Sequence, residues 1–207
     1  MKILLLAPEP FYQDRGTPIA VSLLLRVLSE RGEHVDVLTY HEGRDIKLNC
    51  VTLHRIPNLS FVRDVRPGFS WKKVICDFFM FFKSARLVQK NHYDLIFAVE
   101  ESVFMALVWK WIFKIPYVYD MDSSLAQQLV ESRPILTPFA SLFRFCEGVA
   151  VRNAIGVAPV CESLTAAILS YQPKKVVVLH DIAVLTDSQL DHEDEPDDSG
   201  HLEISKA

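Results

Sequence analysis

Short apolar runs alternate with amphipathic segments along most of the chain. Residues 2–7 are apolar at nearly every position, which is typical of a parallel strand buried between two layers of helices, and residues 35–40 are expected to form a second strand. Between them, residues 17–31 carry polar side chains at helical spacing, and Gly32 follows where a left-handed capping residue belongs. The first forty residues therefore predict a strand–helix–strand unit.

The same alternation continues to residue 180. Further strands are expected at residues 51–56, 94–100, 116–120, 154–159 and 175–180. Helices are expected at residues 71–91, 102–113, 123–131, 138–152 and 162–170. Strands that alternate with helices favour a doubly wound α/β fold, so the sequence predicts a mostly parallel, Rossmann-like sheet of seven strands in the order 3-2-1-4-5-6-7.

The chain has 207 residues, half of them hydrophobic, which is enough for one large domain with a sizeable core. We place this domain at residues 1–185. The segment 186–207 differs in composition, with eight acidic residues, one lysine and no aromatic residue, and we expect it to be a disordered acidic tail.

Several classes of protein and site are disfavoured by simple counts. The four cysteines are scattered without the spacing of a metal site, so reduced thiols and no bound metal are expected. No window approaches the apolar length of a membrane span, and residues 2–8 are too short an apolar run for a signal peptide. These features predict a cytoplasmic protein.

The loop after the first strand is a candidate anion site. It contains Gly16 but neither GxGxxG nor GxxxxGK[ST], which disfavours a nicotinamide dehydrogenase and a P-loop NTPase. A glycine before a helix that begins at Thr17-Pro18, with Thr17 as its N-cap, still lets an anion approach free backbone N–H groups. The alternative is that Gly16 only serves the turn.

Acidic residues follow two of the later strands. In a doubly wound sheet, ligands bind beyond the carboxyl ends of the strands. Asp120 and Asp122 lie at this end of one predicted strand. Such carboxylates can accept hydrogen bonds from sugar hydroxyls or act as general bases. The alternative is that Asp122 or Ser123 caps the next helix. The same two interpretations apply to Glu100 and Glu101, which follow another strand, and Glu162 could equally complement a helix dipole.

Basic and aromatic residues are interleaved from Arg63 to Lys90. Seven basic residues accompany only two acidic ones there, among six aromatic side chains. A basic, aromatic helix at residues 71–90 can lie on an anionic membrane surface. The alternative, which we favour at this stage, is a helix that covers the sheet and exposes its lysines. Nucleic-acid binding is disfavoured because the body of the chain is only weakly basic, with 21 basic and 18 acidic residues in residues 1–186.

Together these segments resemble a known family. Residues 32–39, GEHVDVLT, match the pattern G-H-x-V-x-V-x-T except at Glu33, which stands at the His position. The segments YDLIFAVEESVFMAL, IPYVYDMDSSL, AIGVAPVCESLTAAI and KKVVVLHDIAVL come later in family order. The chain thus resembles the N-terminal, acceptor-side domain of the family 4 retaining glycosyltransferases. These enzymes have the GT-B architecture, in which two Rossmann-like domains face each other across a cleft.

The resemblance implies roles for the candidate residues. Gly16 and Thr17 would lie near the donor diphosphate, and Asp120 and Asp122 would be catalytic where acceptor and sugar meet. The acceptor-binding residues would be Glu100, Glu101, Glu162 and Ser163. Many family members have a histidine after the fifth strand, whereas this chain has YDMD at residues 119–122.

The resemblance also implies a reaction, in which a sugar is transferred from a nucleotide sugar to a glycan or lipid-linked acceptor with retention of configuration. The nucleotide sugar would be a co-substrate, and no cofactor is expected. After the last predicted strand, the E-x7-E spacing occurs only at Glu195 and Glu203, inside the expected acidic tail, so it does not indicate a donor-binding domain. A C-terminal donor-binding half on a separate chain is therefore an expected partner. The alternative function is a non-catalytic binding module derived from a truncated glycosyltransferase. A membrane contact through residues 71–90 would place the protein peripherally at the inner face of the membrane.

Overall fold

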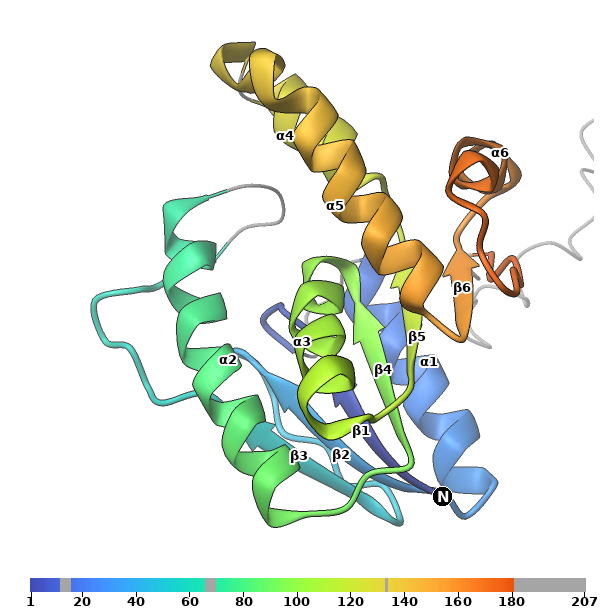
Figure 1. The fold of residues 1–207 in the computed structure, drawn as a ribbon. Coiled ribbons are helices and arrows are strands. Elements are labelled where there is room, and N and C mark those ends of the chain that lie inside the picture. Colours follow the sequence, from blue (N-terminus) through green and yellow to red (C-terminus); the bar gives the residue numbers. More distant parts are fainter. Residues whose placement is uncertain (12–15, 66–69, 133, 181–207) are drawn as a thin grey trace, which may run out of the picture.

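A computed structural model describes residues 1–11, 16–65, 70–132 and 134–180. It shows an α/β fold built on one parallel sheet, so the predicted fold class is confirmed (Figure 1). The strands are β1 (Lys2–Leu6), β2 (His34–Thr39), β3 (Val51–Arg55), β4 (Leu95–Val99), β5 (Tyr117–Met121) and β6 (Gly156–Pro159). The helices are α1 (Gly16–Glu30), α2 (Trp71–Lys90), α3 (Val103–Phe113), α4 (Leu125–Ser132), α5 (Ala140–Asn153) and α6 (Glu162–Ile168). The predicted acidic tail lies outside the described residues.

The sheet has six strands in the order β3-β2-β1-β4-β5-β6, not the predicted seven. The segment expected as a seventh strand runs beside β6 but makes only one isolated parallel bridge, between Val157 and Val176. Val157 N–H donates to Lys175 O at 2.9 Å, and Val177 N–H donates to Val157 O at 3.0 Å. The next bond would need an N–H on Pro159, which has none, so the ladder is interrupted there, although Leu179 N–H still donates to Pro159 O at 3.0 Å.

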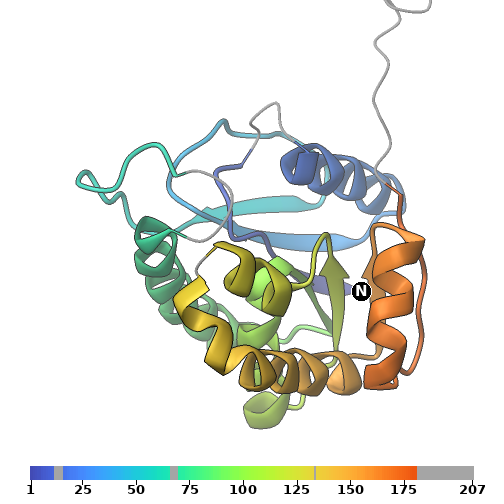
Figure 2. The ribbon, with the colours of Figure 1, turned by 90° about the horizontal axis from the view of Figure 1, so that it is seen from above.

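Helices cover both faces of the sheet, which explains the continuously apolar strands. Leu4 and Leu6 of β1 pack in a core that includes residues of α2, α3 and α5. Ile3 and Leu5, which point the other way, pack against Val21 and Leu25 of α1. Seen from above, α1 lies on one side of the sheet and α2, α3 and α5 lie on the other (Figure 2).

The ends of the first two long helices follow local rules. Gly32 has φ +72° after α1, as predicted, and Glu33 N–H donates to Leu28 O at 3.0 Å, which closes the last turn. The helix begins at Gly16, so Thr17 lies inside it and is not the N-cap we predicted. At the start of α2, Ser70 Oγ accepts a hydrogen bond from Lys73 N–H at 3.2 Å.

Helices α4 and α5 form a hairpin that extends beyond the carboxyl ends of the strands (Figure 1). A 3₁₀ turn, η2 (Pro134–Phe139), connects them where the sequence predicted a break. Two shorter 3₁₀ turns are η1 (Glu100–Ser102), after β4, and η3 (Leu169–Tyr171), after α6. Among the described helices, none combines the length and apolar character that a membrane span requires.

Candidate functional site

The carboxyl ends of the strands bring acidic side chains from distant parts of the sequence together. Glu9 follows β1, Glu100 and Glu101 follow β4, and Asp122 follows β5. The field of these carboxylates raises the pKa of Glu9 and of Glu100, so the groups lie close enough to influence one another. Two further groups, Lys73 and Asp77, reach the same edge from the first turns of α2. We call these six residues the carboxyl-edge cluster.

Asp122 connects the end of β5 to the start of α1. The Thr17 hydroxyl donates a hydrogen bond to Asp122 Oδ2 at 2.7 Å. This contact brings together two residues that the resemblance assigns to the donor diphosphate and to catalysis. It also puts a carboxylate beside the N-terminus of α1, where negative charge complements the helix dipole.

Glu100 occupies an unusual position at the end of β4. Its φ of +51° is in the left-handed region, which costs a non-glycine residue energy and is often found at functional sites. The Ser123 hydroxyl donates to its carboxylate, with 3.3 Å to each oxygen. Burial, and then the charges of Asp122 and Glu101, raise the pKa of Glu100 to about 8. This carboxyl therefore carries a proton over much of the neutral range.

Lys73 supplies positive charge to the cluster. Its ammonium lies 2.6 Å from Glu101 Oε1. Burial lowers the pKa of Lys73, but Glu101 and Asp77 outweigh that effect, so the pKa is raised overall and the lysine stays charged.

Asp77 lies one helical turn after Lys73. The Tyr40 hydroxyl donates to Asp77 Oδ1 at 2.6 Å. Burial, followed by the charge of Glu101, raises the pKa of Asp77 to about 7, although Tyr40 and Lys73 act in the opposite direction. Asp77 therefore titrates near neutrality, unlike an exposed aspartate.

Glu9 completes the cluster from the loop after β1. Burial, and then the charge of Asp122, raises its pKa well above the usual value. Glu9 Oε1 is buried and has no hydrogen-bond partner among the described residues. Because a buried polar atom without a partner is costly, this oxygen is suited to meet a polar group of a ligand.

Asp120 lies within β5, in register with Val99 of β4 and Ala158 of β6. The neighbouring Tyr119 and Met121 are fully buried in the core on the α2–α3 side, and Asp120, half-buried, alternates with them along the strand. Its charge contributes to the raised pKa of Tyr119, although burial is the main cause. Its catalytic role stays a prediction.

Glu162 and Ser163 form the exposed first turn of α6. Among the residues that the structure describes, neither makes a hydrogen bond or ion pair with the carboxyl-edge cluster. Ser163 Oγ instead lies 3.1 Å from Cys161 Sγ, at the N-cap of the same helix. Their assignment to the acceptor site stays a prediction, with less support than that of Glu100 and Glu101.

Sequence reasoning missed Glu9, Lys73 and Asp77. Glu9 was detectable, because it comes shortly after the first strand. Lys73 and Asp77 are four residues apart in a segment that we interpreted as a basic helix. Their helical spacing places them on one face, but nothing local shows that this face meets the sheet edge.

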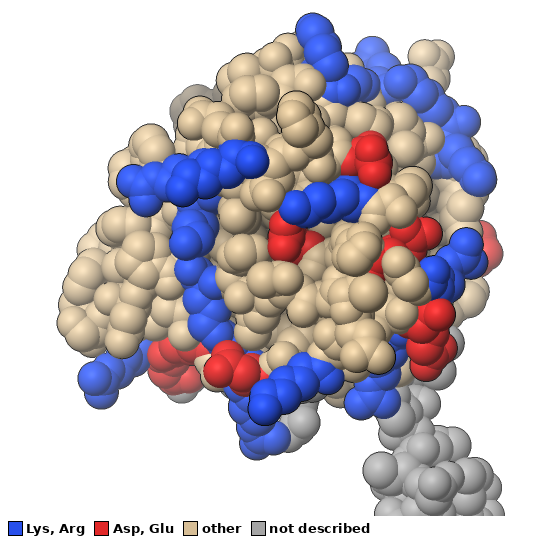
Figure 3. Space-filling model, turned by 90° about the horizontal axis from the view of Figure 1, so that it is seen from below, with Lys and Arg blue, Asp and Glu red and all other residues tan. Residues whose placement is uncertain are grey.

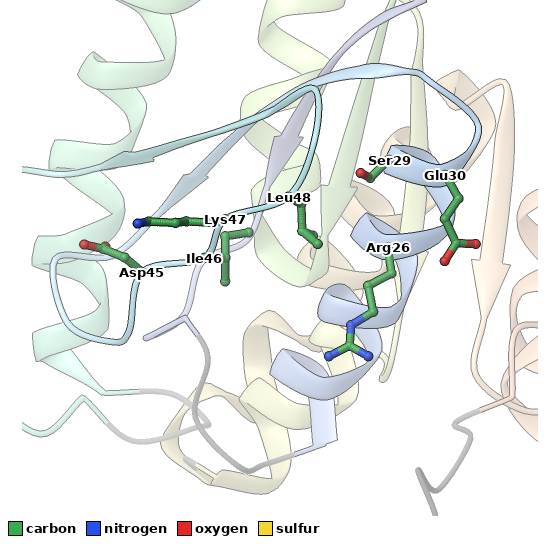
Figure 4. Close-up of a pocket in the computed structure, with 7 residues that line it drawn as sticks. All are labelled: Arg26, Ser29, Glu30, Asp45, Ile46, Lys47 and Leu48. Atoms are coloured by element: carbon green, nitrogen blue, oxygen red, sulfur yellow. The ribbon is translucent and has the colours of Figure 1, made fainter.

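Two pockets elsewhere on the surface have fewer charged side chains that point toward one another than the carboxyl-edge cluster has. One of about 440 Å³ lies between α1 and residues 45–48 (Figure 4). Arg26 comes from α1, whereas Asp45 and Lys47 point away from that helix, so their charges do not converge. Another, of about 470 Å³, lies among α4, α5 and the end of α6, with Arg144 and Tyr171 in its lining.

Comparisons with known proteins agree on the fold. The sequence matches no protein-family model and no curated protein. The structure is similar to sucrose-phosphate synthase from Thermosynechococcus elongatus, with a TM-score of 0.65 and 16% identity over 86% of this chain and 47% of that one. It is also similar to a ugt transferase from Siraitia grosvenorii in complex with UDP, with a TM-score of 0.57 and 12% identity over 92% of this chain and 54% of that one.

A second structure of the Thermosynechococcus synthase is matched over 92% of both chains, with a TM-score of 0.61 and 13% identity. This chain thus has a Rossmann-like fold that resembles half of a GT-B glycosyltransferase. It spans about half the length of the first synthase structure and of the Siraitia transferase. At such low identity the likeness concerns the fold, and the chemistry must be argued from the site.

Proposed function

We propose that this chain is the acceptor-side half of a family 4-type glycosyltransferase. The observation that carries the proposal is the meeting of Thr17, Asp122, Ser123 and Glu100 at the carboxyl edge of a sheet that resembles half of a GT-B enzyme. Ligands of doubly wound sheets bind at this edge, near the point where the strand order reverses at β1 and β4.

The cluster suits hydroxyl-bearing acceptors. Glu100, which carries a proton near neutrality, would donate a hydrogen bond to an acceptor oxygen. Asp122 would accept one from the reacting hydroxyl and take its proton as the new bond to the sugar forms, while the bond between the sugar and the donor diphosphate breaks and the nucleoside diphosphate leaves. Of the two candidate catalytic residues, Asp122 has more support than Asp120. It binds Thr17 of α1 directly, and its charge reaches Glu100 on the other side of the site.

The donor diphosphate would approach from the opposite side. The N-terminus of α1 attracts anions, but the carboxylate of Asp122 lies beside it. The diphosphate at Gly16 and Thr17 would therefore have to displace the hydrogen bond between Thr17 and Asp122. This exchange would free the Asp122 carboxylate for the acceptor when a donor is bound. Retention of configuration is proposed from the family resemblance alone.

The donor-binding half would come from a separate chain. The test is transfer of labelled sugar by the full chain, alone and mixed with a candidate donor-binding half, across several nucleotide sugars and both glycan and lipid-linked acceptors. We expect transfer only with both halves present, and Asp122→Asn to lower its rate by roughly 100-fold or more, in line with the loss of a general base. The matched control is Asp45→Asn, whose side chain is 86% exposed.

The controls separate catalysis from binding. Circular dichroism spectra of both variants must match that of the unchanged chain. Absence of transfer with every donor, with and without the second half, would refute the proposal. If calorimetry then still showed a sugar ligand bound at the cluster, the alternative of a non-catalytic binding module would replace it.

A further inference from the structure

Helix α2 is apolar on two opposite sides. Its inner side, with Cys76, Met80, Leu87 and Val88, is buried against the sheet. Its outer side exposes Trp71 (74%), Val74 (50%), Phe78 (60%) and Phe82 (49%), which are three or four residues apart and so form one stripe. A helix that covers a sheet needs only one apolar face, so the fold does not explain the outer stripe.

Aromatic contacts continue this stripe onto α3. The ring of Phe82 lies 4.8 Å from that of Phe78 and 5.6 Å from that of Phe81. Phe81 stacks on Trp109 of α3 at 4.8 Å, and Trp109 lies 6.0 Å from Phe113 at the end of that helix. Exposed apolar side chains flank that end. We define the outer aromatic face as Trp71, Val74, Phe78, Phe82, Trp111, Ile112 and Phe113.

The charges that accompany this face are basic. Lys90 and Lys114 are exposed at the end of α2 and just after α3, and Arg86, one turn before Lys90, is exposed as well. Asp77 is the one acidic residue in the sequences of α2 and α3, and it accepts the Tyr40 hydroxyl hydrogen bond within the carboxyl-edge cluster. Figure 3 views the molecule from below and shows Lys and Arg side chains, with fewer Asp and Glu side chains among them, beside broad uncharged areas.

The structure also corrects which lysines are available for such a surface. Lys73 is held in the ion pair with Glu101, and Lys72 Nζ donates to Arg63 O at 2.7 Å. The basic helix that the sequence suggested at residues 71–90 therefore exposes its charge toward its C-terminal end. Its N-terminal end presents mainly Trp71 and Val74.

We propose that the outer aromatic face docks on an anionic lipid bilayer. Aromatic and aliphatic side chains on one helix face enter the boundary between headgroups and acyl chains, and adjacent lysines and arginines attract anionic headgroups. A broad exposed apolar patch marks an interaction surface, and the basic residues exposed toward the C-terminal ends of α2 and α3 complement an anionic membrane better than a second copy of the same basic face.

The position of the face adds a consequence that rests on the proposed function. Trp71 is two residues before Lys73, so the face begins next to the carboxyl-edge cluster. A membrane bound there places the site at the bilayer surface. Of the two acceptor classes, this geometry favours a hydroxyl-bearing acceptor on a lipid carrier over a soluble glycan.

The test is flotation of the full chain with vesicles of phosphatidylcholine alone and of phosphatidylcholine mixed with phosphatidylglycerol. We expect binding to the mixed vesicles that weakens as salt is added, and little binding to the neutral ones. The double change Phe78→Ser and Phe82→Ser should lower binding by roughly 10-fold or more, because it removes a large apolar area.

Matched controls come from α1, on the opposite face of the sheet. Val74→Asp should abolish binding, whereas Val27→Asp, at a valine of equal exposure (51% against 50%), should not. Arg86→Glu should weaken binding, and Arg26→Glu, at an exposed arginine of α1, should have little effect. Circular dichroism checks that each variant is folded, and quenching of tryptophan fluorescence by lipid-borne quenchers gives a second measure of insertion.

Several outcomes would overturn the proposal. The first is no binding to either kind of vesicle, and the second is an equal loss of vesicle binding in the α1 and α2 variants. The third is self-association in sedimentation velocity that Val74→Asp removes, in a chain that does not bind vesicles. The last result would assign the face to a second copy of the chain. Vesicle binding without sugar transfer in the two-chain assay would refute the proposed enzymatic function and leave the membrane surface standing.

Discussion

The Thr17 hydroxyl and the Asp122 carboxylate, 105 positions apart in the sequence, are joined by a hydrogen bond of 2.7 Å. This bond ties the start of α1, which lies on one face of the sheet, to the end of β5. Asp122 is also a source of negative charge for the cluster, because it raises the pKa of both Glu9 and Glu100. After burial, the charge of Asp122 is therefore the largest contribution to the raised pKa of both neighbours.

Replacing Asp122 by asparagine should lower the pKa of Glu100 from its value of about 8, because the second-largest cause of the shift disappears. The pKa of Glu9 should fall as well. Titration of ¹³C-labelled glutamate side chains by NMR measures both. Asp94→Asn is the control, since Asp94 accepts from Lys2 N–H at the amino ends of the strands. Equal shifts in the two variants would show that Asp122 is not the source.

Glu100 should make the protein less stable as pH rises. Its pKa is about 8 in the folded chain against an ordinary value of 4.5, so the folded state holds more protons than the unfolded state between these values. The free energy of unfolding should therefore fall from about pH 4.5 to about pH 8. Glu100→Gln should flatten part of this slope and stabilise the protein by on the order of 1–3 kcal/mol at pH 8.

Urea unfolding at a series of pH values measures this effect. Some slope should remain in Glu100→Gln, because Asp77, with a pKa of about 7, acts in the same direction. The control is Glu30→Gln, at an exposed residue in the last turn of α1. An unchanged slope in Glu100→Gln would mean that this carboxyl ionises normally in the folded protein.

Much of the fold could be predicted because its signals are local. The two-sided apolar runs identified β1 and β2, and Gly32 marked the end of α1. Alternation of strands and helices then gave the parallel sheet and the order of its six strands. The predicted seventh strand forms only an isolated bridge to β6, and the N–H that Pro159 lacks interrupts its ladder, which matters only when the neighbouring segment is known.

The candidate site was only partly predictable, because its contacts are long-range. Glu100 and Asp122 could be identified as candidates because each comes directly after a predicted strand, at the edge of the sheet where ligands bind. Lys73 and Asp77 lie on a helix, and their pattern fits a solvated basic face as well as an inward one. Only the packing of α2 on the sheet shows that they point to Glu101 and Tyr40.

Gly43 should be intolerant of a side chain. It has φ +121° and forms a parallel bridge with Phe11, and a Cβ there would lie 1.9 Å from the Phe11 carbonyl oxygen. Gly43→Ala should therefore lower the free energy of unfolding by roughly 2–4 kcal/mol. It should also displace the loop that carries Glu9, and thus change the pKa of that carboxyl.

The control for this change is Gly32→Ala. Gly32 also has a positive φ, but a Cβ there would meet nothing within 4 Å. Its cost should be limited to the left-handed backbone, about 1–2 kcal/mol. Thermal and urea unfolding compare the two variants. Equal losses of unfolding free energy in the two variants would show that the backbone at Phe11 moves to accommodate a Cβ at residue 43 without loss of stability.

Glu147 should be the most sensitive residue of the α4–α5 hairpin. Its side chain is buried, at 2% exposure, and accepts hydrogen bonds from Ser124 Oγ at 3.0 Å, Ala126 N–H at 3.3 Å and Tyr171 O–H at 3.3 Å. It thus satisfies a free N–H in the first turn of α4 from a distant helix. Glu147→Ala would leave these donors without a partner, and should cost about 2–4 kcal/mol.

The size of the loss should follow the number of donors left unpaired. Glu147→Gln keeps one side-chain acceptor oxygen and should cost less than Glu147→Ala. Tyr171→Phe removes a single donor and should cost about 1 kcal/mol. Urea unfolding ranks the three variants, and amide exchange at Ala126 should speed up most in Glu147→Ala. An Ala126 amide that exchanges equally slowly in all three would contradict the capping role of Glu147.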